Sequence, residues 1–460
     1  MTRKAIIVGV NSNQHKNFNY MMDELQNLAE ADNIEVTERM TQGLAKIHSG
    51  HYIGKGKIEE LKELAEEKEI DVIIFNDELS PYQIRNLENL LEYEVIDRTM
   101  LILDIFAKRA KTKEAQLQVE TARLQYELPR VRGGQEENLD QQGGGSGTTN
   151  RGAGEGKLEI NLRTIRHRIQ LLNKELEKIV KERALQRKKR KKKEIPVVSL
   201  VGYTNAGKST VMNNFVSKFS ESENKEVFEK DMLFATLETS VRNITLPDNK
   251  QFLLTDTVGF VSNLPHNLIK AFRSTLEEVC EADLLIHVVD SSSEYLDEMI
   301  KTTNETLEEI GVKDIPVIYV YNKIDLLNGE IPEQTDNILH ISAKNDIGMD
   351  LLLERISEQI FKKYIKTAFL IPYDKGDIVS YFNEKSTVLE ISYEENGTKI
   401  VVECHENDFN KYKRYVVENW VFALIFLPKK AVSKNFETAF LLNLFQLHFL
   451  VFILNHIIAF

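Results

Sequence analysis

A glycine-rich segment between a strand-like run and a helix-like run carries the clearest chemical pattern in the sequence. It is Gly202-Tyr203-Thr204-Asn205-Ala206-Gly207-Lys208-Ser209-Thr210, which fits the pattern G-x-x-x-x-G-K-[ST]. In such a loop the backbone N–H groups surround phosphates, the lysine reaches the β- and γ-oxygens, and the hydroxyl ligates Mg²⁺. The segment predicts a phosphate-binding loop (P-loop) with Lys208 as a catalytic residue and Ser209 as a magnesium ligand.

Three further short segments follow in order, each directly after an apolar, strand-like run. They are Asp256-Thr257-Val258-Gly259, Asn322-Lys323-Ile324-Asp325 and Ser342-Ala343-Lys344. The carboxylate of Asp256 can hold the Mg²⁺ shell, and the N–H of Gly259 can meet a γ-phosphate during catalysis. An ionised Asp325 can accept hydrogen bonds from guanine N1–H and N2–H₂, which adenine does not offer, while the backbone at Ala343 can donate to guanine O6. Together the four segments predict a site for GTP or GDP with Mg²⁺.

A segment that senses the γ-phosphate is expected between the P-loop and Asp256. The candidate is Phe234-Ala235-Thr236-Leu237-Glu238, with Thr236 as a second magnesium ligand and a catalytic residue. The alternative is that Phe234 and Leu237 only pack in a core and that Thr236 is a surface hydroxyl. Phe260 follows Gly259, at the place where many GTPases have the glutamine that orients the attacking water. Because phenylalanine has no polar group, we expect slow hydrolysis by the chain alone and acceleration by a partner or by another residue.

The elements that position these segments are short apolar runs separated by helical stretches. Runs at 197–201, 252–255, 284–289, 317–320 and 338–341 predict βαβ units in a mostly parallel sheet, and hence a P-loop GTPase domain at 195–366. Strand-like runs at 5–10 and 71–75 predict an N-terminal α/β domain at 1–112. Alternating runs on either side of Glu395-Asn396-Gly397 predict a β-hairpin in a small α+β domain at 367–418. The predicted fold class is α/β.

Residues 113–194 are expected to form a helical hairpin around a glycine-rich loop at about 131–157. After the loop, apolar residues alternate steps of three and four, which is a heptad seam that needs a partner helix: Leu162, Ile165, Ile169, Leu172, Leu176 and Ile179. The helix at 113–128 is the nearest partner, and an intermolecular coiled coil is the alternative. We therefore expect a monomer. The glycine-rich loop is a flexible linker or a contact loop, and the basic run Arg187–Lys193 is a solvated face or a contact to phosphate backbone.

The totals describe a multidomain chain of ordinary globular composition. With 460 residues, two to four domains are expected, and a net charge of −12 argues against indiscriminate coating of nucleic acid. The two cysteines, Cys280 and Cys404, fall in different predicted domains, which fits a reducing, cytoplasmic setting. Residues 419–460 form a hydrophobic tail in which Ala439–Phe460 carries no charge and is long enough to cross a bilayer. A membrane anchor and an aberrant extension of the reading frame are both open for this tail.

The chain resembles the HflX family of the Obg-HflX superfamily over about residues 50 to 415. The residues that carry the resemblance are Tyr52-Ile53-Gly54-Lys55-Gly56-Lys57, Leu79-Ser80-Pro81, Val95-Ile96-Asp97-Arg98, Leu124-Gln125-Tyr126-Glu127-Leu128-Pro129-Arg130, Asp256-Thr257-Val258-Gly259-Phe260, Leu264-Pro265-His266 and Ala271-Phe272-Arg273. Where the family usually has a GET sequence in the glycine-rich loop, this chain has Gly154-Glu155-Gly156-Lys157.

The resemblance implies a GTPase that binds the large ribosomal subunit and its RNA. It further implies splitting or rescue of stalled ribosomes under stress, and a glycine-rich loop held near the peptidyl-transferase region. Arg151 and the basic run ending at Lys193 are then candidate phosphate contacts. Two alternatives remain: a GTP-gated factor for ribosome assembly, and an RNA-binding module whose turnover is incidental.

Overall fold

The computed structural model describes most of the chain and leaves several segments out. The described residues are 2–12, 17–133, 151–192, 195–219, 234, 240–262, 264–265, 268, 278–327, 334–335 and 337–417. They fall into two compact units, Met1–Lys362 and a C-terminal unit that begins at Lys363. The predicted switch residues Ala235 to Glu238, most of the glycine-rich loop and the hydrophobic tail lie outside the described residues.

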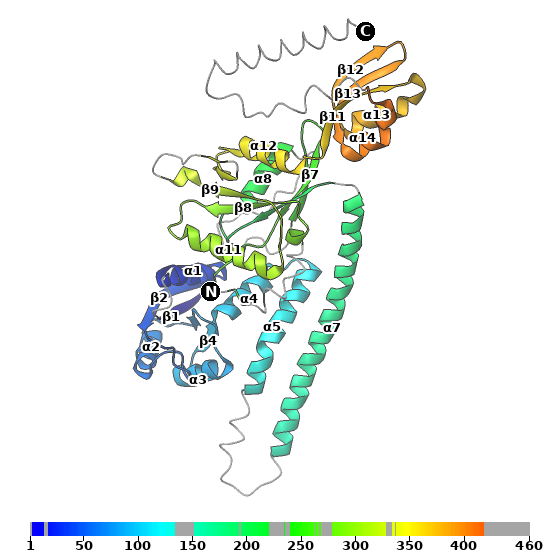
Figure 1. Ribbon diagram of the computed structural model, residues 1–460. Coiled ribbons are helices and arrows are strands. Elements are labelled where there is room, and N and C mark those ends of the chain that lie inside the picture. Colours follow the sequence, from blue (N-terminus) through cyan, green and yellow to red (C-terminus); the bar gives the residue numbers. More distant parts are fainter. Residues whose placement is uncertain are drawn as a thin grey trace. The chain divides into compact units, whose positions relative to one another are not determined.

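The first unit begins with a four-stranded parallel sheet of order β2-β1-β3-β4 (Figure 1). Its elements are β1 (Arg3–Asn11), α1 (Phe18–Ala31), β2 (Ile34–Gly43), α2 (Lys55–Glu67), β3 (Val72–Phe75), α3 (Pro81–Leu91), β4 (Glu94–Asp97) and α4 (Arg98–Arg109). Side chains of β1 alternate between two cores: Ala5 and Ile7 pack in one, and Ile6 and Val8 in the other. Such a sheet, covered on both faces, is why β1 is a continuous apolar run.

The helices that follow form an antiparallel hairpin, as the heptad seam predicts. Helices α5 (Lys113–Gly133) and α7 (Arg151–Lys192) run side by side (Figure 1). Two ion pairs fix their direction, because Glu114 pairs with Arg183 at 2.8 Å and Glu120 with Arg168 at 2.7 Å. All six seam residues of α7 are buried or half-buried, whereas most residues between them are exposed. At 1.5 Å per residue, the 42 residues of α7 extend for roughly 63 Å.

The rest of the first unit is a six-stranded sheet of order β10-β9-β8-β5-β7-β6. Its elements are β5 (Val197–Val201), α8 (Lys208–Phe219), β6 (Ser240–Thr245), β7 (Gln251–Asp256), β8 (Leu284–Asp290), α11 (Leu296–Ile310), β9 (Val317–Asn322), β10 (Ile338–His340) and α12 (Met349–Ile360). All pairs are parallel except β6 with β7. The predicted parallel sheet is therefore confirmed, and the polar motifs follow the carboxyl ends of β5, β7, β9 and β10.

The C-terminal unit is a three-stranded antiparallel sheet with two short helices. It contains β11 (Tyr364–Ile371), α13 (Gly376–Lys385), β12 (Thr387–Glu394), β13 (Gly397–His405) and α14 (Glu406–Tyr412), in the strand order β11-β13-β12. Glu394 pairs with Gly397 at the hairpin end, and Gly397 has φ +152°, a conformation that favours glycine. The predicted boundary at 367 falls inside β11, and the division into five parts stays a prediction. Among the described residues, no helix is both long and apolar enough to cross a membrane.

Candidate active site

The P-loop joins β5 to α8, and its backbone conformation depends on two glycines. Gly202 has φ +142°, and a Cβ there would lie 2.2 Å from the carbonyl oxygen of Val288. Gly207 has φ +92°, and a Cβ there would lie 2.2 Å from Nδ2 of Asn322. Both positions therefore combine a left-handed backbone with a close neighbour, so that a larger residue is excluded.

Lys208 lies at the start of α8 and is buried. Its Nζ donates to the carbonyl oxygens of Gly202 at 3.0 Å and Tyr203 at 2.7 Å. Burial lowers the pKa of Lys208 to about 8, although the nearby Asp256 carboxylate acts in the opposite direction. Burial, with a smaller contribution from the same lysine, lowers the pKa of His287 on β8 to about 4, so that this imidazole is neutral. An anionic phosphate beside Lys208 would favour its charged form.

Two of the residues predicted to hold Mg²⁺ meet where helix α8 begins and strand β7 ends. The Ser209 hydroxyl donates to Oδ2 of Asp256 at 2.7 Å, and Asp256 at the end of β7 is fully buried. Hydroxyl and carboxylate oxygens are the hard ligands that Mg²⁺ prefers, usually with phosphate oxygens and water completing the shell. These two residues therefore fit the ion. Their separate roles, Ser209 as the direct ligand and Asp256 holding the shell, stay predictions. Thr236, the second predicted ligand, lies outside the described residues.

The segment that contains Gly259 lies directly against the P-loop. The Phe260 N–H donates to the Gly202 carbonyl at 3.2 Å, and the Thr204 N–H donates to the Phe260 carbonyl at 2.8 Å. A Cβ on Gly259 would lie 2.7 Å from Cα of Thr204 and 3.0 Å from Nζ of Lys208. The Phe260 side chain is 2% exposed and packs in an apolar cluster of the sheet core. A buried phenyl ring offers no hydrogen-bonding group to a water molecule, and the expected slow intrinsic hydrolysis stays a prediction.

The predicted base-recognition residues are brought together by β9 and β10. Nδ2 of Asn322 donates to the Ala206 carbonyl at 3.0 Å, and the Ala343 N–H donates to Oδ1 of Asn322 at 3.0 Å. Asn322 thus ties the P-loop to the Ser342-Ala343-Lys344 segment. The Ser342 hydroxyl donates to Oδ1 of Asp325 at 2.5 Å, and the Asp325 side chain is otherwise exposed.

The neighbouring residues of this loop have separate contacts. Lys323, with φ +67°, pairs with Asp290 at 2.7 Å, and Ile324 is buried. Lys344 is exposed. Among the other predicted site residues, Thr257 donates to the Leu200 carbonyl at 2.7 Å, and Val258 is 8% exposed in an apolar cluster. The individual roles of all these residues in nucleotide binding stay predictions.

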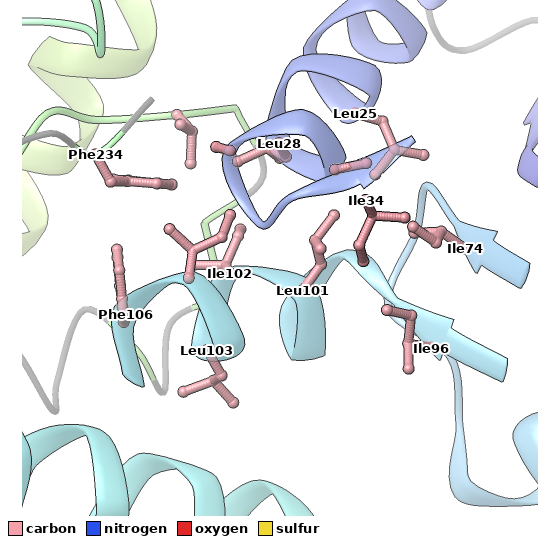
Figure 2. Packing of buried hydrophobic residues seen from close by; sticks show 14 of the residues in the cluster. Leu25, Leu28, Ile34, Ile74, Ile96, Leu101, Ile102, Leu103, Phe106 and Phe234 are labelled. Carbon is pink, nitrogen blue, oxygen red and sulfur yellow. The ribbon is translucent and has the colours of Figure 1, made fainter. Parts of the chain in front are cut away.

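One predicted switch residue, Phe234, is described, and its side chain packs in an apolar cluster. The Phe234 ring lies 4.7 Å from that of Phe106 on α4, in an edge-to-face arrangement (Figure 2). This agrees with the packing alternative for this one residue. Ala235, Thr236, Leu237 and Glu238 lie outside the described residues.

The sequence did not predict three residues that lie far from the P-loop motif in sequence and join its contacts in the structure: Glu24, Arg98 and Ser262. Glu24 on α1 and Arg98 at the start of α4 form a buried ion pair, and Glu24 also accepts a hydrogen bond from the Tyr203 hydroxyl. Ser262 lies next to both Glu24 and Tyr203. A signal was available, because Glu24 lies on the apolar face formed by Met21, Leu25 and Leu28, and a buried charge needs a partner.

A P-loop in a parallel sheet that also carries a guanine-type recognition loop is the arrangement of the P-loop GTPases. Sequence models of three families match the chain in succession: "GTP-binding GTPase N-terminal" at residues 19–107, "GTP-binding GTPase Middle Region" at 109–190 and "50S ribosome-binding GTPase" at 197–323. Similar curated proteins are GTPase HflX of Caldanaerobacter subterraneus subsp. tengcongensis, 46% identical over 87% of this chain and 90% of that one, and GTPase HflX of Escherichia coli K12, 37% identical over 86% and 92%. A solved GTP-binding protein of Sulfolobus solfataricus in complex with GDP is 27% identical, with a TM-score of 0.42, over 78% of this chain and 98% of that one.

The chain belongs to the HflX family of GTPases. It binds guanine nucleotide and hydrolyses GTP.

Proposed function

We propose that this GTPase associates with the large ribosomal subunit in its Mg²⁺·GTP state and splits or rescues stalled ribosomes under stress, in the cytoplasm. Its membership of the family, with a match to a "50S ribosome-binding GTPase" model over the P-loop domain, is the observation that carries the proposal. Peripheral membrane association through the tail after residue 418 remains a separate hypothesis.

The helical hairpin supports this role, because it has the form of a rigid arm. The two helices are tied by the ion pairs of Glu114 with Arg183 and Glu120 with Arg168, and the glycine-rich segment joins their ends. Exposed basic side chains on α7 include Arg163, Arg166 and Lys174, which suit contacts to RNA phosphates. Phosphate contacts would make the association weaken as salt increases.

The nucleotide site supplies the on–off control in this proposal. Ser209 and Asp256 would hold Mg²⁺, which would neutralise negative charge on the phosphates, and the segment at Gly259 would respond to the γ-phosphate. Because Phe260 is buried in the core, acceleration of hydrolysis is expected to come from outside the chain, with the ribosome as the proposed activator.

Sedimentation of intact ribosomes through a sucrose gradient tests the proposal. With the protein and a non-hydrolysable GTP analogue, we expect separated subunits and protein in the large-subunit fractions; with GDP, we expect intact ribosomes and free protein. The variant Asp325→Asn provides an internal control, since it should act with the xanthosine analogue and not with the guanosine analogue. Equal distributions with both guanine nucleotides would remove the proposed role.

Turnover measurements separate the alternatives. Stimulation of GTP hydrolysis by purified large subunits is expected for a ribosome-dependent enzyme. A rate that large subunits leave unchanged would favour an RNA-binding module with incidental turnover. Accumulation of immature subunits in cells that lack the protein, without a defect in splitting, would favour an assembly factor.

A further inference from the structure

The N-terminal sheet places its polar residues towards the P-loop of the GTPase domain. Asn76 follows β3 and Arg98 follows β4, so both lie at the carboxyl edge of a parallel sheet, where doubly wound folds recognise a ligand. In this structure the side chain of Tyr203, the second residue of the P-loop motif, contacts this region. Its ring is 4% exposed, and its hydroxyl donates to the Glu24 carboxylate.

Glu24 is held in place from the other side by Arg98. Both side chains are almost completely buried, at 3% and 2% exposed, and they form an ion pair through Oε2 of Glu24. Arg98 also donates to Oδ1 of Asn76 at 3.1 Å. Oε1 of Glu24 is thereby directed to the GTPase domain. Burial and the Glu24 charge together raise the pKa of Tyr203 well above its ordinary value, so the hydroxyl keeps its proton and acts as a donor.

The same carboxylate contacts the segment that contains Gly259. The backbone N–H of Ser262 donates to the Tyr203 hydroxyl at 2.6 Å and lies 3.4 Å from Oε1 of Glu24. The Ser262 hydroxyl also lies 2.6 Å from that of Tyr203. The buried Glu24 carboxylate therefore contacts both Tyr203 of the P-loop and Ser262, three residues after Gly259.

Apolar contacts surround this polar group. A single cluster joins N-terminal residues such as Leu28, Ile102 and Phe106 to GTPase-domain residues Phe234, Val258 and Val261 (Figure 2 shows Phe234 beside Phe106 and Ile102). Phe234 belongs to the predicted switch, and Val258 and Val261 flank Gly259 and Phe260. Separating a buried polar group from its hydrogen-bond partner raises the free energy. The Glu24 contacts therefore favour one arrangement of the two segments over others.

The arrangement that is favoured here brings Gly259 close to Lys208. In a GTP complex the γ-phosphate has to lie between the Lys208 ammonium and the Gly259 N–H. In the structure a Cβ on Gly259 would lie only 3.0 Å from Nζ of Lys208 and 2.7 Å from Cα of Thr204, so Gly259 is held close to the P-loop. A γ-phosphate placed between them would part Gly259 from Lys208, and Ser262, three residues further on, would then be displaced relative to Tyr203.

We propose that Glu24 is a positioning residue of the GTPase site. Through Tyr203 and Ser262 it stabilises the arrangement in which Gly259 lies against Lys208, so that this N-terminal carboxylate sets the preference for GDP over GTP. The inference rests on the nucleotide site alone and needs no ribosome.

The test compares affinities of the full-length chain for fluorescent GDP and a fluorescent non-hydrolysable GTP analogue, both with Mg²⁺. Tyr203→Phe removes one hydroxyl and keeps the ring. We expect the GTP analogue to gain on GDP by about tenfold, the size of one buried hydrogen-bond group. The KM for GTP should fall accordingly, with kcat changed less.

Tyr52→Phe is the matched control. The Tyr52 hydroxyl also donates to a carboxylate, that of Asp77, and also accepts a backbone N–H, from Val10 at 3.3 Å, but it lies inside the N-terminal core. This variant should lose comparable stability and keep the ratio of the two affinities within about twofold.

Ser262→Ala is the second test variant, because its half-buried side chain can be shortened without loss of the fold. It should shift the ratio in the same direction by about threefold, since the backbone N–H remains. An unchanged ratio in both test variants, or an equal change in both affinities, would overturn the proposal. If Tyr203→Phe does not fold, the ratio measured for Ser262→Ala decides alone.

Discussion

Replacement of Asp325 by asparagine tests how the chain recognises its base. The Asp325 carboxylate is predicted to accept hydrogen bonds from guanine N1–H and N2–H₂, and its Oδ1 accepts a further bond from the Ser342 hydroxyl at 2.5 Å. That hydroxyl is itself oriented, because it accepts the Asn345 N–H at 3.2 Å and so points its proton at residue 325. In Asp325→Asn the amide oxygen should stay on the Ser342 side, which fixes the NH₂ group at the other position.

The expected magnitude follows from the two hydrogen bonds. A bond to a charged group contributes about 1.5–3 kcal/mol. In the variant the amide oxygen can still accept one of the two guanine hydrogen bonds, without charge. The amide NH₂ group faces the other guanine N–H, so two donors meet there. We expect a loss of about 3 kcal/mol for GTP, which corresponds to roughly 150-fold in affinity. Xanthine has an oxygen at position 2, so the variant should bind XTP more tightly than GTP.

Competition between unlabelled nucleotides and fluorescent GDP or XDP measures this reversal. Ser342→Ala is the companion variant, since it removes the group that orients residue 325 and should weaken GTP binding by less, about tenfold or below. An Asp325→Asn protein that still prefers GTP to XTP would refute the assignment of Asp325 to the base.

Four other outcomes are expected. GDP affinity should be constant below about pH 8 and fall by up to about tenfold per pH unit above it, because the depressed pKa of Lys208 leaves the amine of the free protein neutral there, whereas bound phosphate favours the charged form. Titrations with GDP from about pH 6 to pH 9 check this, and a flat profile contradicts it. Ser209→Ala should remove at least about tenfold of the Mg²⁺-dependent gain in GTP affinity, measured with and without EDTA, and an undiminished gain would exclude Ser209 as a ligand. Gly207→Ala should abolish nucleotide binding in a folded protein, since its Cβ would meet Asn322, and retained calorimetric binding of GDP would contradict this. Asp97→Ala should lower the free energy of unfolding by about 3 kcal/mol in urea titrations. The reason is that the fully buried Asp97 carboxylate accepts hydrogen bonds from the N–H groups of Leu79 and Met100 and contacts Tyr126 and Arg130. A loss below about 1 kcal/mol would argue against that network.

Much of the nucleotide site could be predicted from the sequence because its parts are local. A P-loop, a carboxylate after a strand and a base-recognition loop after another strand are each continuous segments, and a parallel sheet brings its carboxyl ends to one edge. The bonds of Asn322 to Ala206 and Ala343 show this convergence. The heptad seam of α7 predicted its partner for the same reason, since the pattern lies on one helix face.

Contacts between distant segments could not be predicted in this way. Tyr203 stands in a phosphate-binding motif, yet its side chain leaves the site for Glu24, 179 positions earlier. Phe234 was a candidate switch residue, and its ring packs on Phe106 of another sheet's helix. No local pattern encodes which buried carboxylate a tyrosine meets. The sequence does show a charged residue, Glu24, on an apolar helix face. This pattern predicts that Glu24 has a buried partner, but it does not identify the partner.

Calorimetric titration of the purified chain with GDP, GTP analogue and ADP, with Mg²⁺ and then with EDTA, tests the central claim most directly. One guanine nucleotide should bind per chain, more tightly with the metal, and ADP should give no saturable heat at the same concentrations. Saturable binding of ADP with an affinity equal to that of GDP, or no heat with either guanine nucleotide, would contradict the assignment of a guanine-specific magnesium site to this P-loop.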